Sequence, residues 1–66
     1  MINYFYTTIT IGQAADSTFI AQALENGYQL EADENSESWM YYDEDAESWY
    51  EIIVEDGKVT MMYSYK

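Results

Sequence analysis

The dipeptide Asp56-Gly57 constrains the fold of this chain more than any other feature. It lies between two segments of alternating apolar residues, a setting in which Asp-Gly indicates a two-residue β-hairpin turn. Such a turn fixes which residues face each other across the two strands. The predicted pairs are Glu55 with Lys58, Val54 with Val59, Ile52 with Met61, and Tyr50 with Tyr63. The apolar pairs share one face, so the sequence predicts a hairpin over residues 48–65 with an apolar side.

The same alternation extends this hairpin into a four-strand antiparallel meander. Residues 28–33 and 38–42 also alternate, and polar loops at 34–37 and around Glu44 and Asp45 separate the strands. The predicted pairs are Leu30 with Tyr41, Ala32 with Trp39, and Trp39 with Tyr50. A competing interpretation makes residues 37–54 a helix, because apolar residues also recur there at helical spacing. The many Tyr, Trp, Asp, Ser and β-branched residues favour strands.

The first half of the chain predicts one more strand and one helix. Residues 1–11 are rich in Ile, Tyr, Phe and Thr, which favour a strand, although its place in the sheet stays open. Residues 13–26 follow the spacing of an amphipathic helix that ends at Asn26-Gly27. Its start is either a capping box of Thr10 with Gln13 or an N-cap at Asp16. Its apolar stripe comprises Phe19, Ile20, Ala23 and Leu24.

These elements predict a single α+β domain over residues 1–66. The expected architecture has two layers, an antiparallel sheet in the order β-α-β-β-β-β and one helix packed on one face. The chain contains no cysteine and no histidine, so it lacks disulfides, thiolate ligands and the commonest general base. We find neither a signal peptide nor a long apolar run, and expect a cytoplasmic protein.

Charge is the feature that a small folded domain does not explain. Thirteen Asp and Glu stand against Lys58 and Lys66, for a formal net charge of −11. Eleven of these acids lie between Glu31 and Asp56, where there is no Lys or Arg. Part of this stretch is duplicated, because residues 33–39 read DENSESW and residues 43–49 read DEDAESW. Each copy is predicted to form a turn and the start of the next strand, which places acidic loops at opposite ends of the meander.

Three ordinary interpretations of the acids compete. They form a solvated surface, although small domains usually mix charges of both signs. They bind calcium, since Asp33, Asn35, Glu37 and Glu44 follow part of an EF-hand spacing, but Ser38 stands where that loop needs glycine. They catalyse acid–base chemistry, but a domain of this size has little room for a cleft that holds two carboxylates. We therefore expect a non-enzyme without cofactor or metal.

A fourth interpretation uses the charge itself. Proteins that bind DNA line their sites with Lys and Arg, and a rigid ridge of carboxylates can occupy such a site in place of the nucleic acid. The acids expected to contact a partner lie in the two loops and between them on the face away from the helix, together with one tyrosine. They are Glu31, Glu34, Glu37, Asp43, Glu44, Asp45, Glu47, Glu51 and Tyr42.

In size, charge and aromatic content the chain resembles the small acidic inhibitors of phages and other mobile elements. These include anti-CRISPR proteins, anti-restriction proteins and uracil-glycosylase inhibitors, many of which mimic DNA. The resemblance rests on no alignable motif and transfers no individual residue. It implies a bacterial host cytoplasm and a target such as the DNA-binding surface of a CRISPR effector, without direct binding of nucleic acid. The alternative is an interaction module or homodimer that uses an apolar sheet face of Met40, Tyr42, Trp49, Ile53 and Met62.

Overall fold

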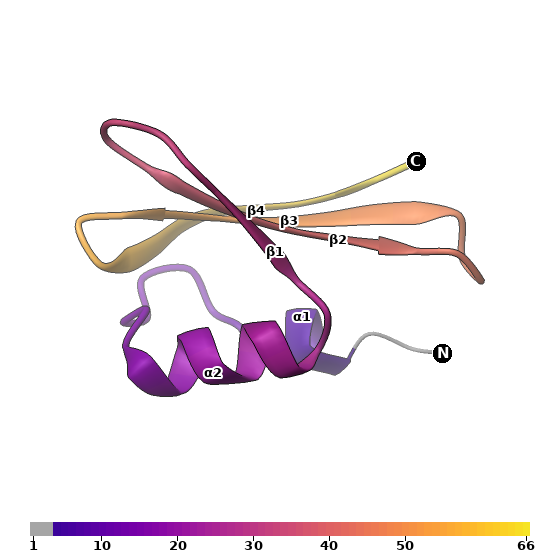
Figure 1. The fold of residues 1–66 in the computed structure, drawn as a ribbon, viewed down its shortest axis with the longest axis horizontal. Helices are drawn as coiled ribbons and strands as arrows, with labels where there is room; N and C mark the ends of the chain where they lie inside the picture. The colour runs from indigo at the N-terminus through magenta and orange to yellow at the C-terminus, as the bar shows by residue number, and fades with distance from the viewer. Residues whose placement is uncertain (1–3) are drawn as a thin grey trace.

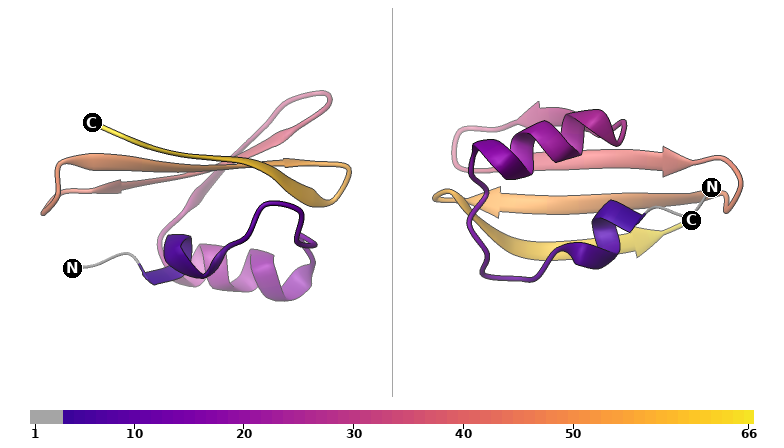
Figure 2. Two further views of the ribbon diagram at one scale, coloured as in Figure 1. Left: turned by 180° about the vertical axis from the view of Figure 1, so that it is seen from behind. Right: turned by 90° about the horizontal axis from the view of Figure 1, so that it is seen from below.

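The computed structural model describes residues 4–66, which form two helices followed by one sheet. The helices are α1 (Tyr4–Thr8) and α2 (Ser17–Glu25), and the strands are β1 (Gln29–Ala32), β2 (Glu37–Asp43), β3 (Ser48–Glu55) and β4 (Lys58–Tyr65). The strands form one antiparallel sheet in the order β1-β2-β3-β4. Both helices lie on the same side of this sheet (Figure 1, Figure 2). The predicted α+β class and the antiparallel meander are confirmed.

The first predicted strand is wrong. Within the described residues its sequence forms helix α1 and an irregular segment, while residues 1–3 lie outside the described part. Phe5 is buried, with its ring 5.5 Å from the Phe19 ring and 5.2 Å from the Tyr28 ring. Strand propensity mostly records how well a side chain packs on a half-buried sheet, so these contacts override it. The element order is therefore α-α-β-β-β-β.

Helix α2 begins later than its apolar spacing predicted. The Asp16 carboxylate accepts a hydrogen bond from the Phe19 backbone N–H at 3.0 Å, which makes Asp16 the N-cap. Residues 12–15 are instead held along β4. The Gly12 N–H donates to the Val59 carbonyl at 2.7 Å, and the Val59 N–H donates to the Gln13 carbonyl at 3.0 Å. These backbone groups pair with the sheet, so the helix cannot extend through them.

The predicted end of α2 at Asn26-Gly27 is confirmed. Gly27 has a φ of 87°, the left-handed conformation that glycine adopts without a Cβ clash. The Tyr28 N–H donates to the Ala23 carbonyl, and the Gly27 N–H donates to the Leu24 carbonyl. This pattern is a Schellman motif, and it turns the chain from the helix into β1.

The hairpin at Asp56-Gly57 has the predicted register only near its turn. Glu55 pairs with Lys58, and Val54 with Val59, as expected. The register then shifts, because Thr60 is an extra residue on β4 and forms a bulge. The pairs beyond it are Ile53 with Met61, Ile52 with Met62, Glu51 with Tyr63 and Tyr50 with Ser64. The predicted pairs of Ile52 with Met61 and Tyr50 with Tyr63 are therefore wrong.

The other two registers differ from the prediction by two residues. Leu30 pairs with Trp39, Trp39 with Ile52, and Tyr41 with Tyr50. The loop between β1 and β2 is two residues shorter than the predicted pairs imply, and the loop between β2 and β3, residues 44–47, is two residues longer. A shift of two residues leaves every side chain on its predicted face.

The core lies between the helices and the sheet face that they cover. Phe19 and Ala23 of α2 are buried, and the Phe19 ring lies edge-on to the Trp39 ring at 6.1 Å. Ile20 and Leu24 were predicted to belong to this stripe, but they are 36% and 58% exposed. The buried hydrophobic residues are Phe5, Phe19, Ala23, Tyr28, Trp39, Ile52, Val54 and Val59. Trp39, from the first DENSESW copy, is therefore a central core residue.

Candidate partner-binding surface

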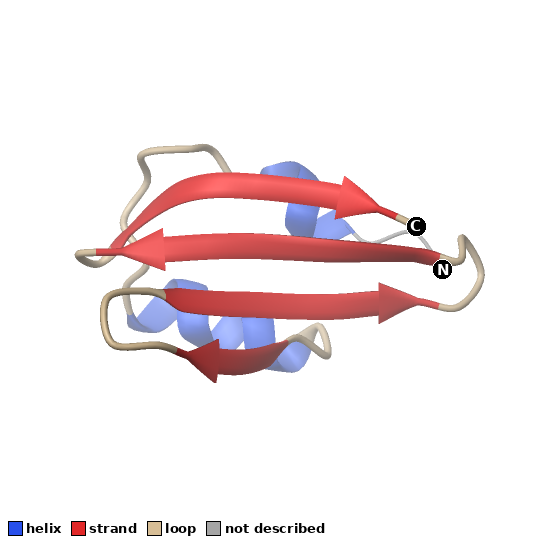
Figure 3. Ribbon diagram, turned by 90° about the horizontal axis from the view of Figure 1, so that it is seen from above, coloured by secondary structure: helices blue, strands red, loops and turns tan. Residues whose placement is uncertain are grey.

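The sheet face that points away from the helices, here called the outer face, is rich in aromatic and apolar side chains. Strand alternation and the observed register place thirteen residues of the four strands on it. They are Gln29, Glu31, Ser38, Met40, Tyr42, Trp49, Glu51, Ile53, Glu55, Lys58, Met61, Tyr63 and Tyr65. Figure 3 looks down on this face, with both helices behind the sheet. Tyr42, Trp49, Met61, Tyr63 and Tyr65 are each about two-fifths exposed.

The bulge at Thr60 decides which residues of β4 face outward. Without it Met62 would lie on the outer face, as we predicted, and Met61 and Tyr63 would point toward the core. The bulge reverses this alternation, so Met62 packs against the core, while Met61 and Tyr63 are exposed. The Thr60 hydroxyl donates to a Glu55 carboxylate oxygen at 2.9 Å, which ties the bulge to the neighbouring strand. The assignment of Met62 to the outer face is wrong.

Glu51 lies near the centre of the outer face, and two hydroxyl groups hold its carboxylate. Ser38 Oγ donates to one carboxylate oxygen, and the Tyr65 hydroxyl donates to the other at 3.3 Å. Its cross-strand neighbours are Met40 and Tyr63. Partial desolvation, then the charge of Glu51 and its hydrogen bond, raises the pKa of Tyr65 above its ordinary value. The Glu51 carboxylate is therefore half-buried and positioned before any ligand arrives.

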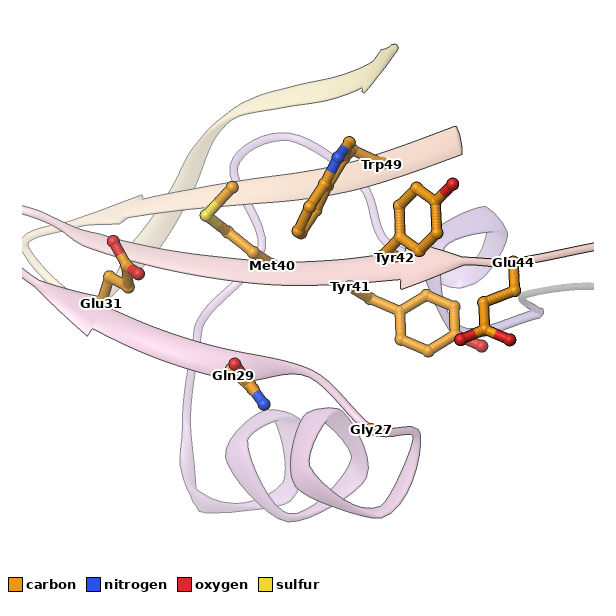
Figure 4. A pocket seen from close by; sticks show the side chains of 8 residues that line it. All are labelled: Gly27, Gln29, Glu31, Met40, Tyr41, Tyr42, Glu44 and Trp49. Atoms are coloured by element: carbon orange, nitrogen blue, oxygen red, sulfur yellow. The ribbon is translucent and has the colours of Figure 1, made fainter. Parts of the chain in front are cut away.

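Two shallow grooves cross the outer face beside this carboxylate. One has a volume of about 470 Å³ and runs from Gly27 past Met40 to Trp49 (Figure 4). The other has a volume of about 440 Å³, and Ser38, Glu51 and Ile53 contribute to its lining. Glu31 and Met40 line both grooves. An extended chain lying across β1 and β2 would therefore contact aromatic rings and carboxylates together.

The acidic loops lie at opposite ends of the sheet, as predicted. Glu34 belongs to the loop between β1 and β2, and the exposed acids Glu44, Asp45 and Glu47 form the loop between β2 and β3 (Figure 3). The longest dimension of the described molecule is 32 Å. Glu31 and Glu51 lie between the loops on the outer face, as expected. Exposed carboxylates thus extend along most of the length of the molecule.

Asp43 does not belong to this exposed set. Its side chain is only 4% exposed, and its Oδ1 accepts hydrogen bonds from the backbone N–H groups of Asp45 and Ala46. These bonds close the turn that follows β2, so the carboxylate is occupied within the molecule. Asp43 was expected to contact a partner, and that placement is corrected to a structural role. Glu37 also departs from expectation, since it is half-buried and begins strand β2.

The sequence missed part of the outer face. Tyr63 and Tyr65 alternate with Ser64 and so were recognisable as one face of a strand. Which face they occupy depends on the bulge, and adjacent Met61 and Met62 give the apolar pattern no preference. The predicted place of Tyr42 on the face away from the helices is confirmed, and its ring packs against Trp49 with ring centroids 5.1 Å apart.

The carboxylates of residues 4–66 do not gather into a metal site. No three His, Cys, Asp or Glu side chains in this part of the chain come close enough to hold a metal ion. The candidate EF-hand ligands Asp33 and Glu44 are separated by the whole of strand β2. This separation argues against the calcium interpretation.

No family model, curated protein or solved structure matches the chain. Neither helix in residues 4–66 is long and apolar enough to cross a membrane.

Proposed function

We propose that this chain is a non-catalytic inhibitor that presents an acidic, DNA-mimicking surface to the basic nucleic-acid-binding site of another protein. The placement of exposed carboxylates at both ends of a rigid sheet, with no Lys or Arg before Lys58, is the main support. In the proposed two-layer arrangement both helices cover one face, which leaves the outer face free for the partner. The resemblance to phage inhibitors favours an anti-CRISPR protein that acts on a CRISPR effector in a bacterial cytoplasm.

The magnitude of the charge is consistent with such competition. Duplex DNA as long as this molecule, 32 Å, carries about 19 phosphate charges, counting both strands. The formal net charge of −11 is of the same order and lies on a chain with only two basic residues. A field of this sign also increases the rate at which a basic site captures the protein.

Charge reversal in the loops tests the proposal. One variant changes Asp33 and Glu34 to Lys, a second changes Glu44 and Glu47 to Lys, and a third combines all four. The purified protein serves as the bait. The first readout is whether it captures a nucleic-acid-binding protein, and the second is whether added duplex DNA displaces that protein from the bait. We expect each two-residue variant to weaken capture and the combined variant to abolish it, while circular dichroism stays unchanged. If the combined variant captures the same protein at full strength, or DNA does not compete, the proposal is wrong.

The exposed aromatic rings of the outer face support a second candidate, a homodimer joined through that face. High salt discriminates the two, since it weakens a charge-led complex but not an apolar dimer. Sedimentation of the purified protein at low and high salt reports its oligomeric state directly.

A further inference from the structure

The outer face combines two kinds of group that the acidic loops do not. Aromatic rings of Tyr42, Trp49 and Tyr63 surround a half-buried carboxylate that Ser38 and Tyr65 hold in place. The two lysines of the chain lie at the ends of β4, Lys58 opposite Glu55 at the hairpin turn and Lys66 directly after Tyr65. The strand positions beside Glu51 are occupied by Met40, Trp49, Ile53 and Tyr63, so the centre of the face is aromatic and anionic and its cations lie at the edges.

This charge argues against a second copy of the chain as the occupant. A symmetric dimer brings the same patch of both copies together. Glu31 and Glu51 of each copy would then be buried against a face that carries the same acids. Two chains with a formal charge of −11 each also repel one another. Burial of a carboxylate without a cationic partner is costly, so the occupant has to supply cations.

Arginine fits the combination of rings and carboxylate better than lysine. Its planar guanidinium stacks on aromatic faces and donates two parallel hydrogen bonds to one carboxylate, whereas the lysine ammonium is a compact, strongly hydrated charge. Trp gives the strongest cation–π interaction of the aromatic side chains, and Trp49 is exposed on this face. The grooves on either side of Glu31 and Met40 have room for the stem of a long side chain.

From this charge complementarity we infer that the outer face docks an arginine-bearing segment of the partner protein. The inference rests on the proposed function, since the basic nucleic-acid site of the target supplies the arginines. It adds that the outer face gives the protein a preference for arginine over lysine, which the charge of the loops alone does not provide.

Two synthetic peptides test it, one of alternating Gly and Arg and one of alternating Gly and Lys, with equal length and charge. Isothermal titration calorimetry at one low ionic strength compares their affinities. We expect the intact protein to bind the arginine peptide about fivefold more tightly, the value of one exposed cation–π contact of about 1 kcal/mol. In Trp49→Leu this preference disappears, and in Trp49→Phe part of it remains. Equal affinities in the intact protein, or no binding of either peptide, overturn the inference.

A matched pair of charge variants separates the face from the loops. Glu51→Gln and Glu47→Gln each remove one negative charge, but only Glu51 lies among the aromatic rings. We expect Glu51→Gln to remove most of the arginine preference, and Glu47→Gln to weaken both peptides slightly while preserving it. An unchanged preference in Glu51→Gln contradicts the inference. Circular dichroism and thermal melting confirm that each variant is folded.

The outcomes for the two proposals are distinguishable. If both peptides bind equally and strongly, the outer-face inference fails, and charge-led mimicry through the loops survives. If the arginine preference is found but duplex DNA does not compete for any captured protein, the proposed function fails, and the outer face stands as a site for arginine-rich segments.

Discussion

The two copies of the acidic repeat share a sequence but place their tryptophans on opposite faces of the sheet. In the first copy Trp39 is 2% exposed in the core, and in the second copy Trp49 is 38% exposed on the outer face. The difference arises at the turns. Asp33 lies in the loop after β1, whereas Asp43 is still the last residue of β2. The turn therefore starts one residue later in the second copy than in the first. A shift of one residue moves the tryptophan to the opposite face of the sheet.

The largest expected difference between the copies concerns stability. Trp39→Ala opens a cavity in the core and should cost about 3–5 kcal/mol. A core of this size rarely supplies more than about 3–5 kcal/mol in total, so we expect this variant to be largely unfolded. Trp49→Ala removes a side chain that is 38% exposed and packs on the outer face against Tyr42, so it should cost much less, about 1 kcal/mol. Urea denaturation followed by circular dichroism measures both.

An unfolded variant shows no urea transition from which a free energy of unfolding can be obtained, so Trp39→Phe provides a milder test. It keeps an aromatic ring and removes the indole N–H, which has no hydrogen-bond partner among the described residues. The urea midpoint of Trp39→Phe should still fall well below that of Trp49→Phe. Equal midpoints would mean that the two tryptophans are equally buried, contrary to the structure.

The next largest difference in stability is expected between variants of Asp33 and Asp43, the first residues of the two copies. In Asp43→Ala two backbone N–H groups of the turn lose a buried acceptor, which should cost about 1–3 kcal/mol. Asp33 is exposed and accepts from the Glu34 N–H alone among its loop neighbours, so Asp33→Ala should change stability by about 0.5 kcal/mol. Both substitutions remove one negative charge, so the difference between them isolates the turn. Asp43→Asn retains the Oδ1 acceptor and should recover most of the loss; equal losses in the two alanine variants would refute the assignment.

Local signals in the sequence predicted most of the sheet. The Asp56-Gly57 turn and the alternation around it set the first two pairs of the hairpin and the face of every residue in β2 and β3. Helix α2 was also recognisable, because Asp16 can cap it and Gly27 can end it. These features depend on neighbours within a few residues, and a single sequence displays them.

The remaining features depend on contacts between distant residues. Residues 4–8 have strand propensity, yet Phe5 packs against Phe19 and Tyr28, which the local pattern does not reveal. Met61 and Met62 are interchangeable to a hydrophobic pattern, so the bulge at Thr60 was invisible and the residues of β4 beyond it were assigned to the wrong face. Asp43 looked like any other loop acid, because its hydrogen bonds to the turn depend on where β2 ends.

One glycine substitution should have opposite effects in the two copies. Glu47 has a φ of 51°, in the left-handed region that a side chain disfavours, whereas its counterpart Glu37 lies in strand β2. Glu47→Gly relieves this strain and should stabilise the protein by up to about 1 kcal/mol. Glu37→Gly weakens a strand and should destabilise it by about 0.5–1 kcal/mol. Thermal melting of the two variants shows the sign of each change in stability. Destabilisation by both substitutions would contradict the assigned turn.

The smallest effect concerns two tyrosines on opposite faces. On the core side, burial and then the neighbouring Tyr50 raise the pKa of Tyr6 from its ordinary value of 10.0. On the outer face, partial desolvation and then Glu51 raise the pKa of Tyr65 from the same value. A pKa raised by folding stabilises the protonated form. This stabilisation is complete below pH 10 and is lost as the pH rises through the folded-state pKa.

Glu51→Gln distinguishes the two causes. It removes the carboxylate charge and the hydrogen bond beside Tyr65, so the Tyr65 pKa should fall part of the way toward its ordinary value and stay raised by desolvation. The Tyr6 pKa should not change, because burial and Tyr50 raise it and Glu51 does not contribute. NMR titration of the tyrosine ring carbons resolves each residue. A Tyr65 pKa that does not move would show that Glu51 does not influence this side chain. The carboxylate at the centre of the outer face would then be screened too well by solvent to orient a guanidinium.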